Sequence, residues 1–322
     1  MSRHVIGVDG GNSKTEVLLV DLAGRILARA RGAGVDSPLQ GLERWRDTLV
    51  TLVDKARATS GLPPDAVAER AVYHLANVDL PDERSVAQRE LARAVPAHAT
   101  VVRNDTFAVL RAGTTRHWGV AVVAGAGVNA VGVHPSGRTA RFLALGDVSG
   151  DRGGGQDLGV GGLGAAVRAR DGRGPATSLA VSIPAYYGLR RPEDVAVAVH
   201  RGTVGYGDLH ALAPLVFAAA RAGDAVAASI LAGFADEVAV MAVALIRRLH
   251  LTRSDVEVVL GGGTLQAGDP EVLRRITVGV HATAPRAQVR VLDVPPVFGA
   301  VVEALTGAGA TPTALRRARA AL

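Results

Sequence analysis

Cysteine is absent from the 322 residues of this chain. Without a thiol the protein can form no disulfide, no thiolate metal site and no iron–sulfur cluster held by its own side chains, and it has no cysteine nucleophile. These exclusions remove several classes of redox protein. Any chemistry must therefore depend on carboxylates, hydroxyls, amines, imidazoles and backbone groups.

Lysine and aromatic residues are also scarce. Lys14 and Lys55 are the only lysines and aromatic residues make up 3% of the chain, although the net charge is +6 and the pI is near 10.4. A nucleic-acid surface needs clustered cations and rings on which bases stack. Because the arginines are scattered, we expect a solvated surface and no nucleic-acid partner.

Long apolar runs are missing as well. The longest candidate, Val238 to Ile246, falls short of the ~18 residues that a membrane-spanning helix needs. Asp9 interrupts the apolar stretch that an N-terminal signal peptide would require. With 48% apolar and 20% charged residues, the composition predicts a globular protein, which we expect in the cytoplasm with no membrane partner.

The order of the predicted elements indicates an α/β fold. A chain of this length predicts roughly two domains, and the first part predicts a β-β-β-α-β-α-β order with mixed strand pairing. Helices are expected at 42–61, 81–95, 156–170, 176–187, 193–200, 209–222, 224–249, 270–283 and 297–305. Besides a hairpin within 5–21, strands are expected at 25–31, 70–75, 99–103, 118–124, 129–133, 138–142, 256–260 and 289–292.

The strand, Gly-rich turn and returning strand of the first hairpin recur about 115 residues later, at Trp118 to Val133, which indicates an internal duplication. Chance similarity between two Gly-rich hairpins is the alternative. We expect domains at 1–113 and 114–322, and the last helix could return to pack on the first domain.

The hairpin at Val5 to Asp21 contains the first candidate site. Its tip can form a concavity of backbone N–H groups that binds an anion, Ser13 and Thr15 add hydroxyl donors, and Asp9 at the strand end can hold Mg2+. An ordinary Gly-Gly hairpin is the alternative, since short motifs often match by chance.

Two further carboxylates stand out. Asp105 follows a predicted strand and precedes a predicted helix, so it is either a plain helix N-cap or a general base that accepts a proton from a substrate hydroxyl. Asp151 lies among the eight glycines of residues 144–163. It is either an ordinary turn residue or an acceptor for sugar hydroxyls.

Together these motifs resemble the actin, sugar kinase and Hsp70 ATPase superfamily, and within it the N-acetylglucosamine kinase group of the BadF/BadG/BcrA/BcrD ATPase family. The opening at 7–15, the pair Asn104-Asp105, the turn at 125–129, the loop at 150–155 and the glycines at 261–263 carry this resemblance. It implies two ribonuclease H-like (actin-like ATPase) domains with an interdomain cleft, and an ATP-dependent amino-sugar kinase that forms a homodimer.

The resemblance also implies residue roles. Asp105 would be the catalytic base for the 6-hydroxyl of N-acetylglucosamine or glucosamine, and Asp9 would associate with Mg2+. The sugar would contact Asp36, Asn129 and Asp151. Residues expected to hold ATP are Gly10, Gly11, Asn12, Ser13, Lys14, Thr15, Gly125, Ala126, Gly127, Gly262 and Gly263.

The chain departs from the family pattern in ways that bear on function. The second loop reads Gly125-Ala126-Gly127-Val128, without the Thr and Ser common in the family, and the Gly-Asp loop is flanked by Leu145-Gly146 and Arg152-Gly153-Gly154. Asp36 replaces an Asn that these kinases commonly place near the sugar. As a hypothesis, a carboxylate there would suit the charged amine of glucosamine better than an acetamide.

Two alternative functions differ in class. An ATPase that activates 2-hydroxyacyl-CoA dehydratases belongs to the same family, but it needs cysteines for its cluster, so their absence excludes it. A non-catalytic module that binds sugar or nucleotide remains open, because the second loop lacks hydroxyl donors. The presence of Asp9, Lys14, Asp105 and Asp151 favours the kinase.

Overall fold

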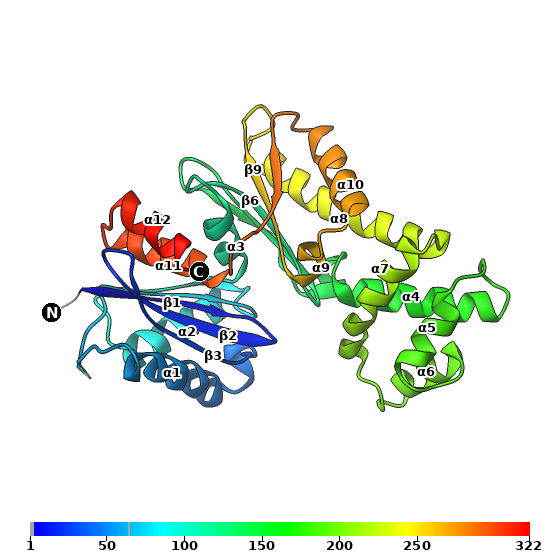
Figure 1. Cartoon of the computed structure of the whole chain (residues 1–322), viewed down its shortest axis with the longest axis horizontal. Helices are drawn as coiled ribbons and strands as arrows, with labels where there is room; N and C mark the ends of the chain where they lie inside the picture. The colour runs from blue at the N-terminus through cyan, green and yellow to red at the C-terminus, as the bar shows by residue number, and fades with distance from the viewer. Residues whose placement is uncertain (1–2, 64) are drawn as a thin grey trace. The chain divides into compact units, whose positions relative to one another are not determined.

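The computed structural model describes residues 3–63 and 65–322. The chain divides into two compact units: Met1–Ala121 with Leu292–Leu322 form the first unit, and Val122–Val291 form the second. Each unit is built around a five-stranded sheet (Figure 1). The domain boundary expected after residue 113 stays a prediction.

The first unit contains a mixed sheet in the order β3-β2-β1-β4-β5. β2 pairs antiparallel with β1 and β3, whereas β1, β4 and β5 are parallel, so their carboxyl ends lie at one edge. Its elements are β1 (His4–Gly10), β2 (Lys14–Asp21), β3 (Ile26–Ala33), η1 (Pro38–Gln40), α1 (Leu42–Ala58), β4 (Arg70–Leu75), α2 (Pro81–Ala94), β5 (Thr100–Asn104), α3 (Thr106–Gly113), α11 (Val297–Gly307) and α12 (Pro312–Ala320).

Helices cover both faces of this sheet. The apolar positions of α1 recur at helical spacing, which buries Trp45 and Leu49 in one core with the strands. On the other side, α11 packs against β1, β4 and α3. Glycine permits this approach, because a Cβ at Gly7 would lie 2.7 Å from Val301 Cγ2 and one at Gly299 would lie 2.0 Å from the Ala108 carbonyl oxygen.

The second unit repeats the topology of the first. Its sheet has the order β10-β9-β6-β7-β8, which read from β8 matches the first sheet strand for strand and confirms the predicted duplication. Its elements are β6 (Gly119–Ala124, shared with the end of the first unit), β7 (Val128–Val133), β8 (Thr139–Arg141), η2 (Gly146–Ser149), α4 (Gly155–Arg170), α5 (Leu179–Tyr186), α6 (Pro192–His200), η3 (Tyr206–Leu212), α7 (Ala213–Arg221), α8 (Ala225–Arg248), β9 (Glu257–Gly261), α9 (Gly263–Gln266), α10 (Pro270–His281) and β10 (Gln288–Val291).

Three expectations about the helices need correction. The helix expected at 209–222 is interrupted, because η3 ends at Leu212 and α7 begins one residue later with Pro214 in its first turn. Residues 263–266, where the sequence predicted no helix, form the short helix α9. The terminal helix α12 was not assigned from the sequence, although Thr311 caps it and proline begins it.

α8 is apolar over a longer stretch than expected from the apolar run at Val238 to Ile246. Among the described residues it is the one helix that is long and apolar enough to cross a membrane, and half of its apolar stretch is buried inside the protein. α8 packs against α7 and α10, as the core helix of a soluble protein does. The cytoplasmic location stays a prediction.

Candidate active site

Asp9 and Asp105 lie at the same edge of the first sheet. Asp9 is next to last in β1, and Asp105 directly follows β5. Backbone hydrogen bonds join the strands there, from the Ala76 N–H to the Gly10 carbonyl oxygen (2.7 Å) and from the Asp105 N–H to the Leu75 carbonyl oxygen (3.1 Å). The two carboxylates are close enough that the charge of Asp105 perturbs Asp9.

Asp105 does not cap α3. It occupies the N-cap position, but its side chain makes no capping hydrogen bond. Instead, Asn104 Oδ1 accepts hydrogen bonds from the Thr106 N–H (3.0 Å) and the Thr106 hydroxyl (2.5 Å). The plain N-cap interpretation is therefore wrong.

Asp9 lies in a concentration of negative charge. Burial, together with the charges of Asp105 and Glu16, raises the pKa of Asp9 to about 8, while the Lys14 ammonium opposes this rise. The described residues contain no cluster of three or more potential metal ligands. Because Mg2+ often binds through one or two carboxylates together with substrate phosphates, Asp9 fits such an ion, whose charge would offset the repulsion.

The tip between β1 and β2 is a tight turn. The Gly11 N–H donates to the Lys14 carbonyl oxygen (2.9 Å), and Asn12 and Ser13 are exposed beyond it. Gly10 leaves no room for a side chain, because a Cβ would lie 2.7 Å from Leu75 Cδ2.

Thr15 differs from its neighbours in the tip. Its hydroxyl is fully buried and has no hydrogen-bond partner among the described residues, so the side chain points into the core. In this conformation a nucleotide could not reach the Thr15 hydroxyl.

The loop that carries Asp36 packs directly on this tip. The Val35 N–H donates to the Gly11 carbonyl oxygen (3.1 Å), and a Cβ at Gly34 would lie only 1.9 Å from the Asn12 carbonyl oxygen. Asp36 is exposed. The structure thus brings the expected phosphate loop and one expected sugar contact side by side within the first unit.

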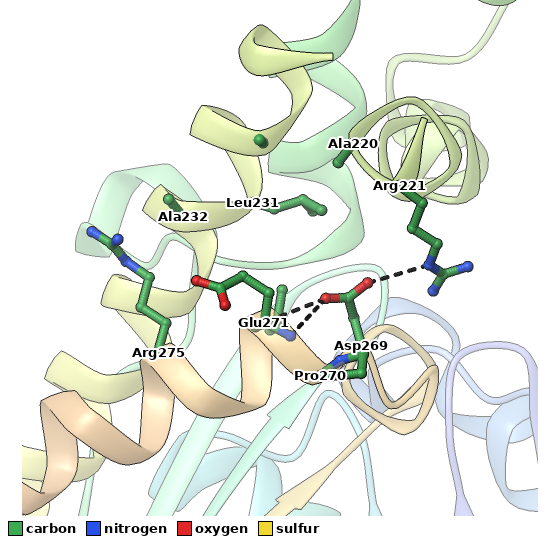
Figure 2. Close-up of a pocket in the computed structure, with 10 residues that line it drawn as sticks. Ala220, Arg221, Leu231, Ala232, Asp269, Pro270, Glu271 and Arg275 are labelled. Atoms are coloured by element: carbon green, nitrogen blue, oxygen red, sulfur yellow. Dashed lines mark hydrogen bonds and ion pairs between the residues drawn. The ribbon is translucent and has the colours of Figure 1, made fainter. Parts of the chain in front are cut away.

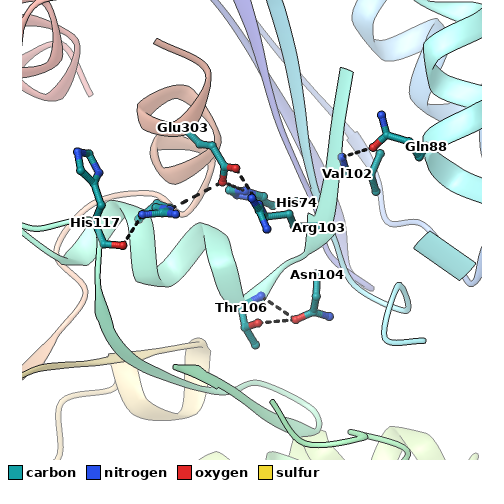
Figure 3. Close-up of polar contacts among 9 residues, drawn as sticks. His74, Gln88, Val102, Arg103, Asn104, Thr106, His117 and Glu303 are labelled. Atoms are coloured by element: carbon teal, nitrogen blue, oxygen red, sulfur yellow. Dashed lines mark hydrogen bonds and ion pairs between the residues drawn. The ribbon is translucent and has the colours of Figure 1, made fainter. Parts of the chain in front are cut away.

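A buried ion cluster supports the sheet beside Asp105. Glu303 of α11 accepts a hydrogen bond from Arg103 Nε (2.7 Å) and lies 3.1 Å from His74 Nε2, as Figure 3 shows. Burial lowers the pKa of His74, whereas the hydrogen bond from His74 and the charge of Arg103 outweigh the effect of burial on Glu303 and lower its pKa to about 2. This cluster joins α11 to β4 and β5.

The Gly-rich turns of the second unit meet one another. The Gly125 carbonyl oxygen accepts hydrogen bonds from the Gly155 N–H (2.8 Å) and the Thr264 hydroxyl (3.1 Å). Gly262 has φ +86°, and a Cβ there would lie 2.3 Å from the Ala124 carbonyl oxygen. The second unit therefore joins the turn at 125–127 to Gly262 and the start of α9.

The two expected sugar contacts of the second unit lie in different surroundings. Asp151 follows η2 and accepts a hydrogen bond from Ser149, and its N–H donates to the Gly146 carbonyl oxygen (3.2 Å). Asn129 is in β7, where its Oδ1 accepts from the Ala130 N–H (2.7 Å). Both side chains are half-buried.

One pocket of about 390 Å3 lies elsewhere in the second unit, between α7, α8 and α10 (Figure 2). None of the residues expected at the site lines it. The charged groups at its rim are already paired, Arg221 with Asp269 and Arg275 with Asp236. This pocket therefore offers no unpaired charge for a phosphate.

Sequence reasoning missed three polar residues beside the site, namely Asn77, Asp79 and Glu83. Asn77 Nδ2 donates to Asn12 Oδ1 (2.6 Å), and Asn104 Nδ2 donates to Asp79 Oδ1 (2.9 Å). Glu83 accepts hydrogen bonds from the Asp79 and Leu80 N–H groups. Only Glu83 carries a sequence signal, because an acidic residue in the first turn after a proline is typical of a helix start.

Residues 6–307 match the BadF/BadG/BcrA/BcrD ATPase family. The chain belongs to this family. The resemblance noted from the motifs is thereby confirmed over nearly the whole chain.

Two curated relatives are named as amino-sugar kinases. The chain is 26% identical to an N-acetylmuramic acid/N-acetylglucosamine kinase of Clostridium acetobutylicum, over 82% of this chain and 86% of that protein. It is 25% identical to an N-acetyl-D-glucosamine kinase of Dictyostelium discoideum, over 83% and 87%.

Solved structures confirm the fold class. A protein of Chromobacterium violaceum provisionally assigned as an N-acetylglucosamine kinase matches with a TM-score of 0.71 at 24% identity, over 94% of this chain and 99% of that one. A ROK family glucokinase of Streptomyces griseus, solved with glucose and AMPPNP, matches with a TM-score of 0.53 at 18% identity, over 94% and 98%. The family member described here thus has the α/β, actin-like ATPase fold with two duplicated sheets.

Proposed function

We propose that this protein is an ATP-dependent kinase that phosphorylates a hydroxyl of an amino sugar, most simply the 6-hydroxyl of N-acetylglucosamine or glucosamine. Its family is an ATPase family, and both curated relatives described above are N-acetylglucosamine kinases. We also expect the homodimer that the resemblance implies.

The observation that carries the proposal is the placement of Asp105. Its side chain does not cap α3 and lies near Asp9 at the carboxyl edge of the sheet. A carboxylate in this position can accept the proton of a sugar hydroxyl as that oxygen attacks the γ-phosphorus. Asn104 caps α3 by accepting a hydrogen bond from the Thr106 N–H. Asp105 can therefore act as the base while the first turn of α3 stays capped.

The first unit supplies the phosphate contacts in this proposal. Backbone N–H groups of the tip at 10–15 and the Lys14 ammonium would bind the β- and γ-phosphates. Mg2+, when bound beside Asp9, would offset the charge of these phosphates. Asp9 must then be ionised, which the positive charge of the ion favours.

The second unit supplies the remaining contacts. We propose that the turns at 125–127 and 262–263 hold the nucleotide, and that Asn129 and Asp151 bind the sugar. Backbone N–H groups in the turn at 125–127 can replace the hydroxyl donors that the sequence lacks there.

Activity with a sugar panel tests this function. Purified protein with ATP and Mg2+ should release ADP only when an accepted sugar is present. Asp105→Asn should lower kcat by about 10²- to 10⁴-fold, the usual contribution of a general base, while nucleotide binding is retained. Asp82→Asn, an exposed carboxylate in the first turn of α2, is the matched control and should leave kcat unchanged.

The same assay separates the kinase from a non-catalytic binding module. If the protein binds nucleotide and sugar but releases no ADP with any sugar, the kinase proposal is wrong and the module is favoured. If Asp105→Asn is as active as the parent, Asp105 is not the base.

The substrate proposal depends on Asp36. Its exposed carboxylate would pair with the ammonium of glucosamine, whereas an amide would suit the acetamido group of N-acetylglucosamine. Asp36→Asn should therefore shift the ratio of kcat/KM toward N-acetylglucosamine. An unchanged ratio would show that Asp36 does not select the sugar.

A further inference from the structure

We propose that Asn77 is a positioning residue that couples sugar binding to nucleotide binding. This inference rests on the proposed function, because it assigns the two ligands to the two loops that Asn77 joins. The residue follows β4 and belongs to none of the motifs that identify the family.

Asn77 connects the tip at 10–15 to the loop at 34–37. Its Nδ2 donates to Asn12 Oδ1 at 2.6 Å and to the Val35 carbonyl oxygen at 3.3 Å. One side-chain amide thus holds a residue of the phosphate loop and the residue directly before Asp36.

The backbone of Asn77 has an unusual conformation that suits asparagine. Its φ of +58° is left-handed, a conformation that most side chains avoid and that asparagine tolerates. Three non-glycine residues among those described share a positive φ. Of these, Asn77 is the one whose side chain joins the two loops.

The two loops also contact each other directly, so their conformations depend on each other. The Val35 N–H donates to the Gly11 carbonyl oxygen, and Gly34 leaves no space for a Cβ against the Asn12 carbonyl oxygen. A sugar that orders the loop at 34–37 would therefore also order the tip at 10–15, so the second ligand would lose less conformational entropy.

Further hydrogen bonds extend the connection toward the proposed base. The Ser37 hydroxyl donates to Glu83 Oε1 (3.3 Å), and Glu83 Oε2 accepts from the Asp79 N–H (2.8 Å). Asp79 then accepts from Asn104 (2.9 Å), the residue before Asp105. The sugar loop is thus linked to both the phosphate loop and the strand end that carries the base.

The test is a binding cycle. The dissociation constant of ADP with Mg2+ is measured by calorimetry with and without saturating sugar, for the parent and for Asn77→Gly, which keeps the left-handed backbone and removes both hydrogen bonds. Coupling between two sites is typically about 5- to 150-fold. We expect the parent to fall in that range and Asn77→Gly to show less than about a twofold effect of sugar.

Steady-state kinetics provide a second readout. Asn77→Gly should raise KM for ATP and for sugar, but kcat at saturation of both should stay within about threefold of the parent, because Asp105 is untouched. A residue that matters only for folding would lower the active fraction and leave both KM values unchanged.

Gln88→Leu is the matched control. Gln88 is another half-buried amide of the first unit with two hydrogen bonds, and neither partner lies in the two loops. Its Nε2 donates to the Thr100 carbonyl oxygen, and its Oε1 accepts from the Val102 N–H (2.9 Å), as Figure 3 shows for Val102. Its loss should change stability and leave coupling intact. If Asn77→Gly does not fold, Asn77→Asp, which tolerates the same backbone and cannot donate, should show the same loss of coupling.

The outcomes separate this inference from the proposed function. A parent that binds both ligands with no mutual effect, or an Asn77 variant with parental coupling, overturns the inference even if the parent is an active kinase. A parent that phosphorylates no sugar overturns the kinase instead, and its binding cycle still decides the role of Asn77.

Discussion

The ion cluster around Glu303 allows a quantitative prediction about the first unit. Glu303→Gln keeps the size and hydrogen-bonding capacity of the side chain and removes its charge. A carboxyl whose pKa falls from 4.5 to about 2 on folding contributes about 3 kcal/mol at neutral pH, at 1.36 kcal/mol for each unit of pKa. Glu303→Gln should lower the free energy of unfolding at pH 7 by up to this amount.

The pH dependence follows from the sign of this shift. A lowered pKa in the folded state means that the contribution is complete above the unfolded value of 4.5 and declines as the pH falls toward 2. About half of it should be gone at pH 3. The parent and Glu303→Gln should therefore converge in acid.

Tryptophan fluorescence can follow this unit alone. The chain has two tryptophans, Trp45 and Trp118, and both belong to the first unit. Urea titrations at pH 7 and pH 3 would measure the difference in unfolding midpoint. The matched control is Glu69→Gln, because Glu69 pairs with the exposed Arg3, and exposed pairs contribute little. Equal midpoints for parent and Glu303→Gln at pH 7, or a difference that is as large at pH 3, would refute the reasoning.

Two predictions concern the second unit. Gly262→Ala should weaken nucleotide binding at least tenfold, because the new Cβ would lie 2.3 Å from the Ala124 carbonyl oxygen at φ +86°. Gly233→Ala, at an exposed position of α8 with open space for a Cβ, is the control and should bind nucleotide as the parent does. Equal calorimetric affinities for the two variants would contradict this prediction. Asp224→Ala should destabilise the second unit by about 1–2 kcal/mol. The reason is that Asp224 caps α8 by accepting from the Val226 and Ala227 N–H groups and also accepts from the Ser178 hydroxyl. A calorimetric melting profile unchanged from that of the parent would contradict this prediction.

Much of the secondary structure was predictable from local patterns. The strand at Arg70–Leu75 was predicted to the residue, and α1 and α8 were predicted closely, because apolar periodicity and flanking Gly or Asp are local signals. α9 was missed because four residues are too few to show a helical period. Leu209 and Leu212 share apolar spacing with α7, so the break between η3 and α7 left no trace in the periodicity.

Some residues of the candidate site could also be predicted from local patterns, and others could not. Asp9 and Asp105 could be singled out as candidates, because one ends a predicted strand and the other follows one, and parallel strands bring their carboxyl ends to one edge. Asn77 and Glu303 could not, because their partners Asn12 and His74 lie 65 and 229 positions away in the chain. Pairings at such separations have no local signature.

The amino-acid sequence by itself determined the fold class, the duplication, the family and the glycine-rich turns, because each depends on patterns within a short stretch or on their order. Only the tertiary structure decided that Asn104 caps α3 in place of Asp105, that the Thr15 hydroxyl is buried and that Asn77 joins two loops. These outcomes depend on which distant residues compete for the same hydrogen bond or the same space, and that competition exists only once the chain has folded.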